Sequence, residues 1–284
     1  MTEENELRTG AEQRHAVRRI LLTVEYDGSA YAGWQRQING LAVQQVLEEA
    51  LTRACGHSVS VTGASRTDAG VHASCQKAHF DTVCSIPPDK FCFVLNTMLP
   101  RDIRVRDSQE VPPAFHARFL TSGKTYLYRI WNARHDSALR RNTHWHVPVP
   151  LDEQKVMRAL QDLTGTHDFA AFQAAGGTAK TTLRTIHEAS LSTCASPFGK
   201  EWVLTVRGNA FLYNMVRIIA GTAAEIGLGK KAQDAFARAF VTLDRLELGM
   251  TAPARGLELY EVTYPEKAFT EPAALRWHEE EGPC

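Results

Sequence analysis

The stretch that organises the chain is Gly63-Ala64-Ser65-Arg66-Thr67-Asp68-Ala69-Gly70-Val71-His72-Ala73. A β-branched run at 59–62 precedes it and a second predicted strand, 76–83, follows it. Its glycines allow a sharp turn, and its Asp and Thr side chains can bond nearby amides and stiffen that turn. We therefore expect Arg66 and Asp68 on a rigid loop at a strand end, where chemistry is often found.

Two structural explanations compete with a catalytic one for this loop. Asp68 alone is typical of a turn-former, and Arg66 with Asp68 could form a surface ion pair of little energy. The whole string, however, resembles the catalytic motif of the TruA family of tRNA pseudouridine synthases, whose R-T-D-A-G-V-H core carries the catalytic aspartate. The resemblance implies that Asp68 is the essential carboxylate and that Arg66 handles the substrate. Many members have Gly where this chain has Ser65, a difference that concerns the local turn.

Size and charge place few limits on the partner. The 284 residues suffice for one large domain or two modest ones, and 44% hydrophobic with 23% charged residues describes an ordinary globular protein. The formal net charge is zero, so bulk charge indicates no nucleic acid. Residues 101–146 nevertheless hold nine Lys or Arg against four Asp or Glu. This excess fits either a polyanion-binding face or a solvated basic face.

The cysteines and the hydropathy pattern bear on location. The six cysteines form no C-x-x-C pair, and we expect them to be reduced. No run of 18 apolar residues occurs, so we expect no membrane span. With no signal peptide recognised, these features predict a cytoplasmic protein.

The predicted elements divide the chain into two α/β domains with two extensions. We expect a disordered leader over 1–16, a first domain over 17–112, a second over 113–265, and a solvated acidic tail over 266–284, with a linker at 111–113. The first domain is predicted to contain strands at 20–26 and 103–111 and helices at 41–55 and 90–98. The second is predicted to contain strands at 124–130, 185–192, 201–207 and 257–263, helices at 152–163 and 208–221, and a mobile loop at 174–182.

Three further segments carry candidate site residues. Residues 31–37 include Trp34, which either stacks on nucleotides or packs in an edge strand. Tyr126 lies in the predicted strand 124–130, where a tyrosine is normally a core residue. Arg217 is a charge in a mainly apolar helix, either extended to the surface or paired when buried. All three segments resemble the TruA family, as does the H-A-R string at 116–118. The resemblance implies that Tyr126 is the active-site tyrosine and that Arg217 pairs with Asp68.

The same resemblance, which spans about residues 22–263, implies fold and activity. The family fold is α+β, with two domains of mainly antiparallel sheet and helices on one face, a basic active-site cleft between the domains, and a homodimeric assembly. The implied function is isomerisation of uridine to pseudouridine at positions 38, 39 and 40 of the tRNA anticodon stem-loop.

The implied reaction constrains the site. It breaks the N1–C1′ bond and joins C5 to C1′ with no gain of electrons or atoms, so we expect neither cofactor nor metal, and one carboxylate suffices. Asp68 attacks C1′ or removes the C2′ proton, and the sequence leaves both open. We expect Arg217 to lower the pKa of Asp68 and Tyr126 to contact the flipped base. The competing functions are a non-catalytic RNA-binding protein of this fold and a synthase acting on another RNA.

Overall fold

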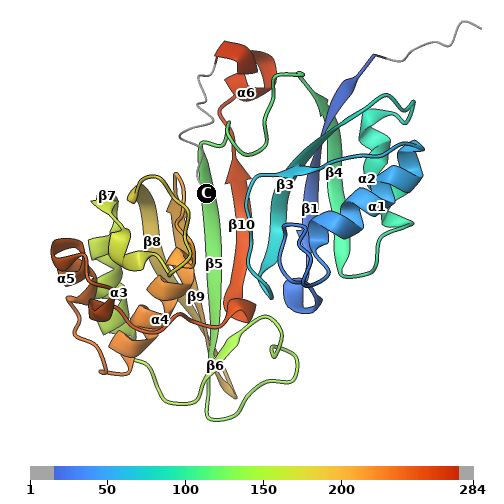
Figure 1. Ribbon diagram of the computed structural model, residues 1–284. Coiled ribbons are helices and arrows are strands. Elements are labelled where there is room, and N and C mark those ends of the chain that lie inside the picture. The colour runs from blue at the N-terminus through green and yellow to red at the C-terminus, as the bar shows by residue number, and fades with distance from the viewer. Residues whose placement is uncertain (1–15, 275–284) are drawn as a thin grey trace, which may run out of the picture.

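The computed structural model describes residues 16–274, whose strands form one ten-stranded sheet. The strand order is β4-β1-β3-β10-β5-β9-β8-β7, with β2 beside β3 and β6 beside β5 (Figure 1). Most neighbours are antiparallel, and only β3 with β10 and β5 with β6 run parallel among these strands. The predicted leader lies outside the described residues, apart from residue 16. The α+β class expected from the sequence is confirmed.

The first half of the chain builds one end of the sheet. Strand β1 pairs with both β3 and β4, and the half consists of β1 (Arg18–Tyr26), α1 (Val43–Cys55), β2 (Thr62–Gly63), β3 (His72–Thr82), α2 (Phe91–Asn96) and β4 (Ile103–Val111). Helix α1 buries Val43, Leu47 and Leu51 against the sheet and ends at Gly56, which adopts the left-handed conformation suited to that position. The expected helix 90–98 is split into a 3-10 turn and the short α2.

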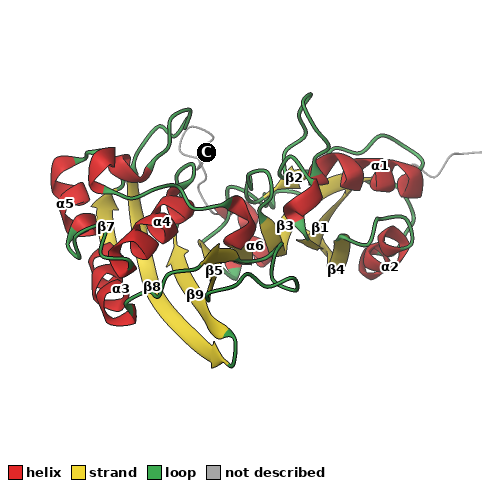
Figure 2. Cartoon of the chain, turned by 90° about the horizontal axis from the view of Figure 1, so that it is seen from below, coloured by secondary structure: helices red, strands yellow, loops and turns green. Residues whose placement is uncertain are grey.

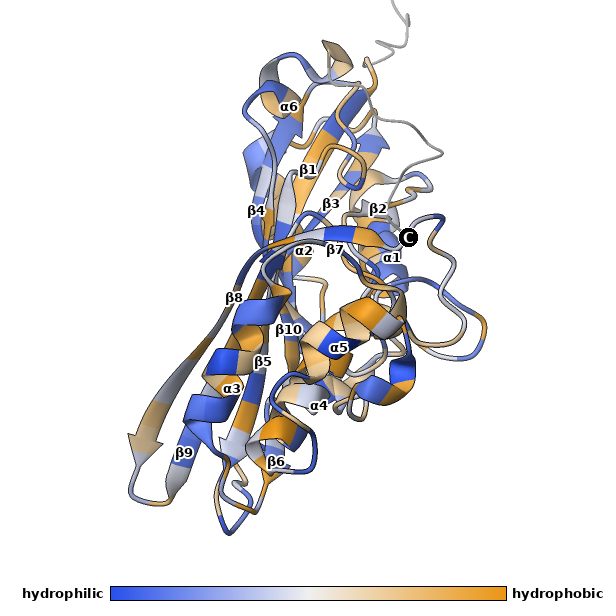
Figure 3. Ribbon diagram, turned by 90° about the vertical axis from the view of Figure 1, so that its left-hand side faces the viewer, coloured by the Kyte–Doolittle hydropathy of each residue, from blue (hydrophilic) through white to orange (hydrophobic). Residues whose placement is uncertain are grey.

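The second half builds the other end. Its elements are β5 (Gly123–Asn132), β6 (Trp145–Val147), α3 (Glu153–Leu160), β7 (Gly165–Asp168), β8 (Leu183–Ser196), β9 (Gly199–Gly208), α4 (Met215–Gly227), α5 (Ala235–Thr242), β10 (Leu257–Thr263) and α6 (Lys267–Thr270). Helices α3, α4 and α5 lie on one side of β8 and β9 (Figure 2). Helix α3 buries Val156 and Leu160. Figure 3 shows hydrophilic residues along much of this helix. The helical pattern of 152–163 also predicts an inward Met157, and this is wrong, because Met157 is 48% exposed.

The last strand joins the two halves of the sheet. β10 lies between β3 and β5, and its short parallel contact with β3 pairs Glu258 with His72 and Leu259 with Ala73. The quoted stretch 63–73 therefore ends at the junction between the halves. The backbone forms a continuous sheet across this junction, and the division into domains 17–112 and 113–265 remains a prediction.

Two expectations about the second half are wrong. The expected helix 208–221 begins only at Met215, because the Asn209 side chain accepts hydrogen bonds from Thr185 N and Ala210 N and so holds a non-helical turn. The described part of the expected solvated tail is packed: Ala268 is fully buried and the ring of Phe269 stacks on Phe115 at 5.4 Å. Residues 275–284 of that tail lie outside the described residues.

Among residues 16–274, none of the helices combines the length and the hydrophobicity that crossing a membrane requires.

Candidate active site

The loop that carries Asp68 is held by the strand that follows it. The buried Gln76 side chain accepts from Ser65 N at 3.2 Å and donates to Ser65 O at 2.6 Å, so both backbone groups of Ser65 are fixed. Val71 N donates to Asp68 O at 3.1 Å and closes a turn around Asp68. Gly70 takes φ +79° within this turn, a conformation that favours glycine. The expected rigid loop at a strand end is confirmed.

A second segment, residues 27–37, packs against this loop. Trp34 N donates to Thr67 O at 3.0 Å, and Gly70 N donates to Tyr31 O at 3.3 Å. Gly33 makes the approach possible, since its φ is +96° and a Cβ there would lie 2.5 Å from Thr67 O. Trp34 is 2% exposed, so it is packed as the second alternative expected, although residues 31–37 form no edge strand.

Asp68 and Arg217 lie 149 residues apart in sequence and meet in the structure. Arg217 Nη1 donates to Asp68 Oδ2 at 3.2 Å, while its Nε donates to Ala252 O at 2.8 Å. Ala252 N returns a bond to Arg217 O at 3.0 Å, so the arginine is tied to the 250–252 segment by backbone and side chain. The pairing expected from the sequence is present, and Arg217 belongs to the first turn of α4.

The pKa of Asp68 depends on burial as well as on Arg217. The two side chains are 27% and 18% exposed for Asp68 and Arg217, respectively. Burial raises the pKa of Asp68, and the charge and hydrogen bond of Arg217 lower it by less, so the net pKa is raised. The lowering expected from Arg217 is present, but desolvation of the loop outweighs it.

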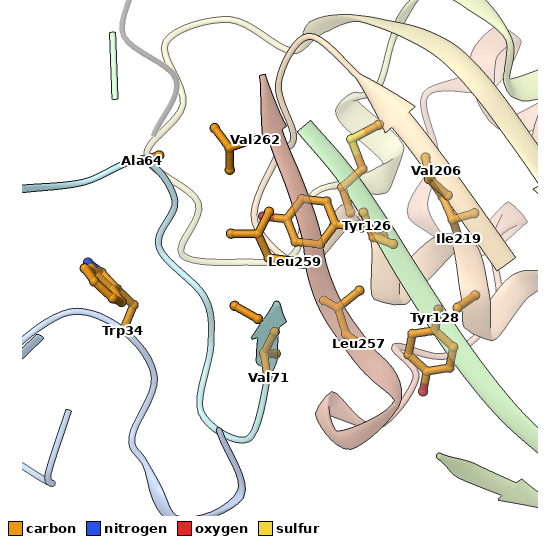
Figure 4. Close-up of a cluster of buried hydrophobic side chains, with 14 of the residues drawn as sticks. Trp34, Ala64, Val71, Tyr126, Tyr128, Val206, Ile219, Leu257, Leu259 and Val262 are labelled. Carbon is orange, nitrogen blue, oxygen red and sulfur yellow. The ribbon is translucent and has the colours of Figure 1, made fainter. Parts of the chain in front are cut away.

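Tyr126 projects from β5 toward the same loop. Figure 4 shows its ring beside Leu259, in the space between β5 and the chain that carries Ala64 and Val71. The residue is 8% exposed, its ring meets Phe211 edge-on at 5.0 Å, and its hydroxyl lies 3.2 Å from Ser65 Oγ. Burial raises the pKa of Tyr126 to about 12, so the phenol stays protonated at neutral pH.

One pocket of about 500 Å³ gathers three of the four predicted site residues. Arg66, Asp68 and Tyr126 line it, and Arg217 reaches it through its contact with Asp68. Arg66 is exposed there. The expected mobile loop contributes residues 176–179, and the turn before α4 contributes Phe211 and Asn214.

The basic residues between 101 and 146 do not form one patch. Arg118 and Lys124 line the pocket of Asp68, whereas Arg101, Arg104 and Arg129 line a second hollow. Successive residues of a strand point to opposite faces, and Tyr126 and Arg129 on β5 accordingly line different pockets. The local charge excess in the sequence is thus divided between two faces of the sheet.

Three residues of the site were missed from sequence. Asn214 accepts from Arg217 Nη1 at 2.7 Å, Gln76 clamps the loop, and Lys124 Nζ donates to Ala64 O at 2.9 Å. A polar Gln within an alternating strand and an Asn three residues before a buried Arg were the available signals. Neither signal identifies its partner without the fold.

The chain is similar to known proteins over most of its length. A family model described as tRNA pseudouridine synthase matches residues 22–120 and 159–265, ranges that contain Asp68 and Arg217. The chain belongs to the tRNA pseudouridine synthase family. The synthase is 46% identical to a tRNA pseudouridine synthase A of Ruminiclostridium cellulolyticum over 251 residues, which cover 87% of the synthase and 100% of that relative.

Other matches extend the comparison. A protein of the same name from Exiguobacterium sibiricum is 44% identical, with 88% of the synthase and 98% of the relative covered. Among solved structures, a Cbf5–Nop10–Gar1 complex aligns with 73% of the synthase and 44% of the matched chain, at 12% identity and a TM-score of 0.33. The family resemblance expected from the motif at 63–73 is confirmed by the family model and the relatives.

Proposed function

We propose that this synthase isomerises uridine to pseudouridine at positions 38, 39 and 40 of the tRNA anticodon stem-loop, with Asp68 as the catalytic carboxylate. The observation that carries the proposal is the ion pair of Asp68 and Arg217 in a pocket shared with Tyr126. A protein that only bound RNA would have no use for a half-buried carboxylate, because RNA is a polyanion.

Asp68 serves the isomerisation in its ionised form. Arg217 opposes the effect of burial and keeps the carboxylate aimed into the pocket. The carboxylate either attacks C1′ or removes the C2′ proton as the N1–C1′ bond breaks. The uracil then turns within the pocket and bonds to C1′ through C5. In the first route this bond replaces the Asp68–C1′ ester bond, and in the second Asp68 returns its proton to C2′. C5 releases one proton and N1 takes up one, so the product is an isomer of the substrate and Asp68 is restored. The atoms and electrons balance without a cofactor or a metal.

Arg66 and Tyr126 hold the target nucleotide in this scheme. Arg66 is exposed where it lines the pocket, and it contacts RNA there and keeps the nucleotide out of the stack. Unstacking costs on the order of a few kcal/mol, and less in a loop. Tyr126 contacts the flipped uracil, and its hydroxyl relays the C5 proton in the final step: the phenol, protonated at neutral pH, passes its own proton to solvent in the pocket as it takes the proton from C5.

The assembly and location belong to the same proposal. The pocket is lined by residues that precede the linker 111–113 in the sequence, Arg66 and Asp68, and by residues that follow it, Tyr126 and Phe211. This supports a cleft between the two proposed domains. A homodimer and a cytoplasmic location follow from the family resemblance and from the reduced cysteines expected in the sequence.

The experiment that tests the function measures tritium release from tRNA that carries 5-[³H]uridine. We expect release by the wild-type chain and none by Asp68→Asn, with tRNA binding retained by both. Release by both proteins would place the catalytic carboxylate elsewhere. Release by neither, with tight tRNA binding, would favour a binding protein or a synthase that acts on another RNA.

A further inference from the structure

Lys124 is a buried cation in the same pocket as Asp68. It lies on β5 two residues before Tyr126, so both side chains point to the same face of the sheet. The residue is 6% exposed, and its Nζ donates to Ala64 O at 2.9 Å, at the start of the loop that carries Asp68. Lys124 makes no ion pair with any carboxylate in residues 16–274.

Two arginines increase the positive charge around this amine. Arg118 comes from the connector before β5 and lines the pocket, and Arg184 comes from β8 and is 6% exposed. Burial, together with the smaller effects of the charges of Arg118 and Arg184, lowers the pKa of Lys124 to about 7. Lys124 and Arg118 thus bring two cationic groups to one partly enclosed pocket, where attraction to an anion is stronger than in open water.

We propose that Lys124 and Arg118 bind one phosphodiester group of the RNA, next to the nucleotide whose uracil reaches Asp68, and that Arg184 strengthens this subsite from behind. The inference rests on the proposed function, because a nucleotide held at Asp68 brings a phosphate on each side of it into the pocket. An ammonium group has three donors, and the bond to Ala64 O uses one of them. The same side chain then couples phosphate binding to the position of the catalytic loop.

Binding of a phosphate would be linked to protonation of Lys124. A neighbouring anion raises the pKa of the amine, so RNA binding takes up a proton wherever the free amine is partly neutral. Because the free pKa is about 7, RNA affinity should fall as the pH rises above that value.

The other ionisable groups around this amine do not titrate in that range. The arginines Arg118 and Arg184 keep their charge there, as the guanidinium group does throughout this range. Asp68, whose pKa is raised by burial, is replaced by Asn in the test, the pKa of His116 is lowered to about 4 by burial, and that of Tyr126 is raised to about 12.

The test replaces single phosphates of an anticodon stem-loop RNA by neutral methylphosphonates. Affinity is measured in an Asp68→Asn background, which prevents turnover, with and without Lys124→Met. We expect the replacement of one phosphate beside the target uridine to weaken RNA binding about tenfold when Lys124 is present. The same replacement should have no effect on binding to Lys124→Met. Equal losses at every linkage in both proteins would overturn the proposal.

Three controls separate the possible outcomes. Arg101→Met alters an exposed cation that lines the other pocket, and it should leave the linkage effect unchanged. Lys124→Arg should keep the linkage effect but lose the fall in affinity above pH 7; a retained fall would overturn the assignment to Lys124. Thermal unfolding shows whether Lys124→Met is folded. A wild-type chain that shows the linkage effect without tritium release would contradict the proposed function and leave the subsite standing.

Discussion

Arg217 shares one nitrogen between a charged and a neutral acceptor: its Nη1 lies 3.2 Å from Asp68 Oδ2 and 2.7 Å from Asn214 Oδ1. Asn214 has φ +61°, in the left-handed region that asparagine tolerates better than most side chains. That conformation places its amide just before α4, within reach of the guanidinium. Asn214 therefore orients Arg217 without supplying a charge that would compete with Asp68.

The first prediction concerns Asn214→Asp. A second carboxylate on Arg217 would share its positive charge, so the pKa of Asp68 should rise beyond its already raised value. The acid limb of the rate profile for tritium release should then move to higher pH, with activity recovering under more alkaline conditions. Asn214→Ala, which removes the hydrogen bond and adds no charge, should not move the limb upward. Identical pH–rate profiles for the two variants would show that a charge at position 214 does not change the pKa of Asp68.

The second prediction concerns stability. Because folding raises the pKa of Asp68, the folded state binds this proton more tightly than the unfolded state. Stability should fall as the pH rises from the unfolded pKa to the folded pKa, and the loss persists above that window. Asp68→Asn removes the buried charge and should stabilise the chain at neutral pH by on the order of 0.5–1 kcal/mol.

The partner variant should behave in the opposite way. Arg217→Met leaves Asp68 buried without its cation and should cost about 2–3 kcal/mol at neutral pH. Thermal unfolding at neutral pH and at a pH below the window measures both effects, and the gain from Asp68→Asn should vanish at the lower pH. A lower melting temperature for Asp68→Asn at neutral pH would contradict the assignment of the buried charge.

The third prediction compares two glycines with positive φ. A Cβ on Gly33 would lie 2.5 Å from Thr67 O, in the backbone of the catalytic loop, whereas a Cβ on Gly56 would meet nothing within 4 Å. Both alanine substitutions strain the backbone at a cost of about 1 kcal/mol, but only Gly33→Ala must displace the loop. We expect Gly33→Ala to lose most tritium release and Gly56→Ala to retain it. Equal activities in the two folded variants would mean that the loop tolerates the displacement.

Local patterns in the sequence predicted the elements with strong periodicity. The strands 103–111 and 257–263 match β4 and β10, and the stop of α1 at Gly56 follows from glycine's conformational freedom. The start of α4 was missed because the side-chain bonds of Asn209 depend on β8, which lies far away in sequence. The parallel contact of β10 with β3 depends on the whole topology, and no local pattern indicates it.

The site shows the same division. Asp68, Arg66, Tyr126 and Arg217 were found because short motifs mark them in the sequence. Their roles as catalytic and substrate-binding residues remain predictions, whereas the contact of Arg217 with Asp68 is present. The lowering of the Asp68 pKa by Arg217 was expected, whereas the larger opposing effect of burial was not, because burial depends on packing that a motif does not describe. Lys124 was likewise visible only as one letter of the K-T-Y string until its burial was known.

The last prediction concerns the hydroxyl of Tyr126. Tyr126→Phe keeps the ring that packs on Phe211 and removes only the oxygen that lies 3.2 Å from Ser65 Oγ. If this oxygen takes the C5 proton, tritium release should fall about a hundredfold while RNA affinity is unchanged. Because the pKa of Tyr126 is about 12, the phenol is protonated at neutral pH and must pass on its own proton as it takes the one from C5.

The matched control is Ser65→Ala, which keeps the phenol and removes its partner. Since the hydrogen bond from Ser65 lowers the pKa of Tyr126, this variant should raise that pKa and should slow release far less than Tyr126→Phe. A 5-deuterated substrate checks the step itself, because slow C5 proton transfer in Tyr126→Phe should produce an isotope effect on product formation. A wild-type rate in Tyr126→Phe would assign the contribution of this residue to its ring alone.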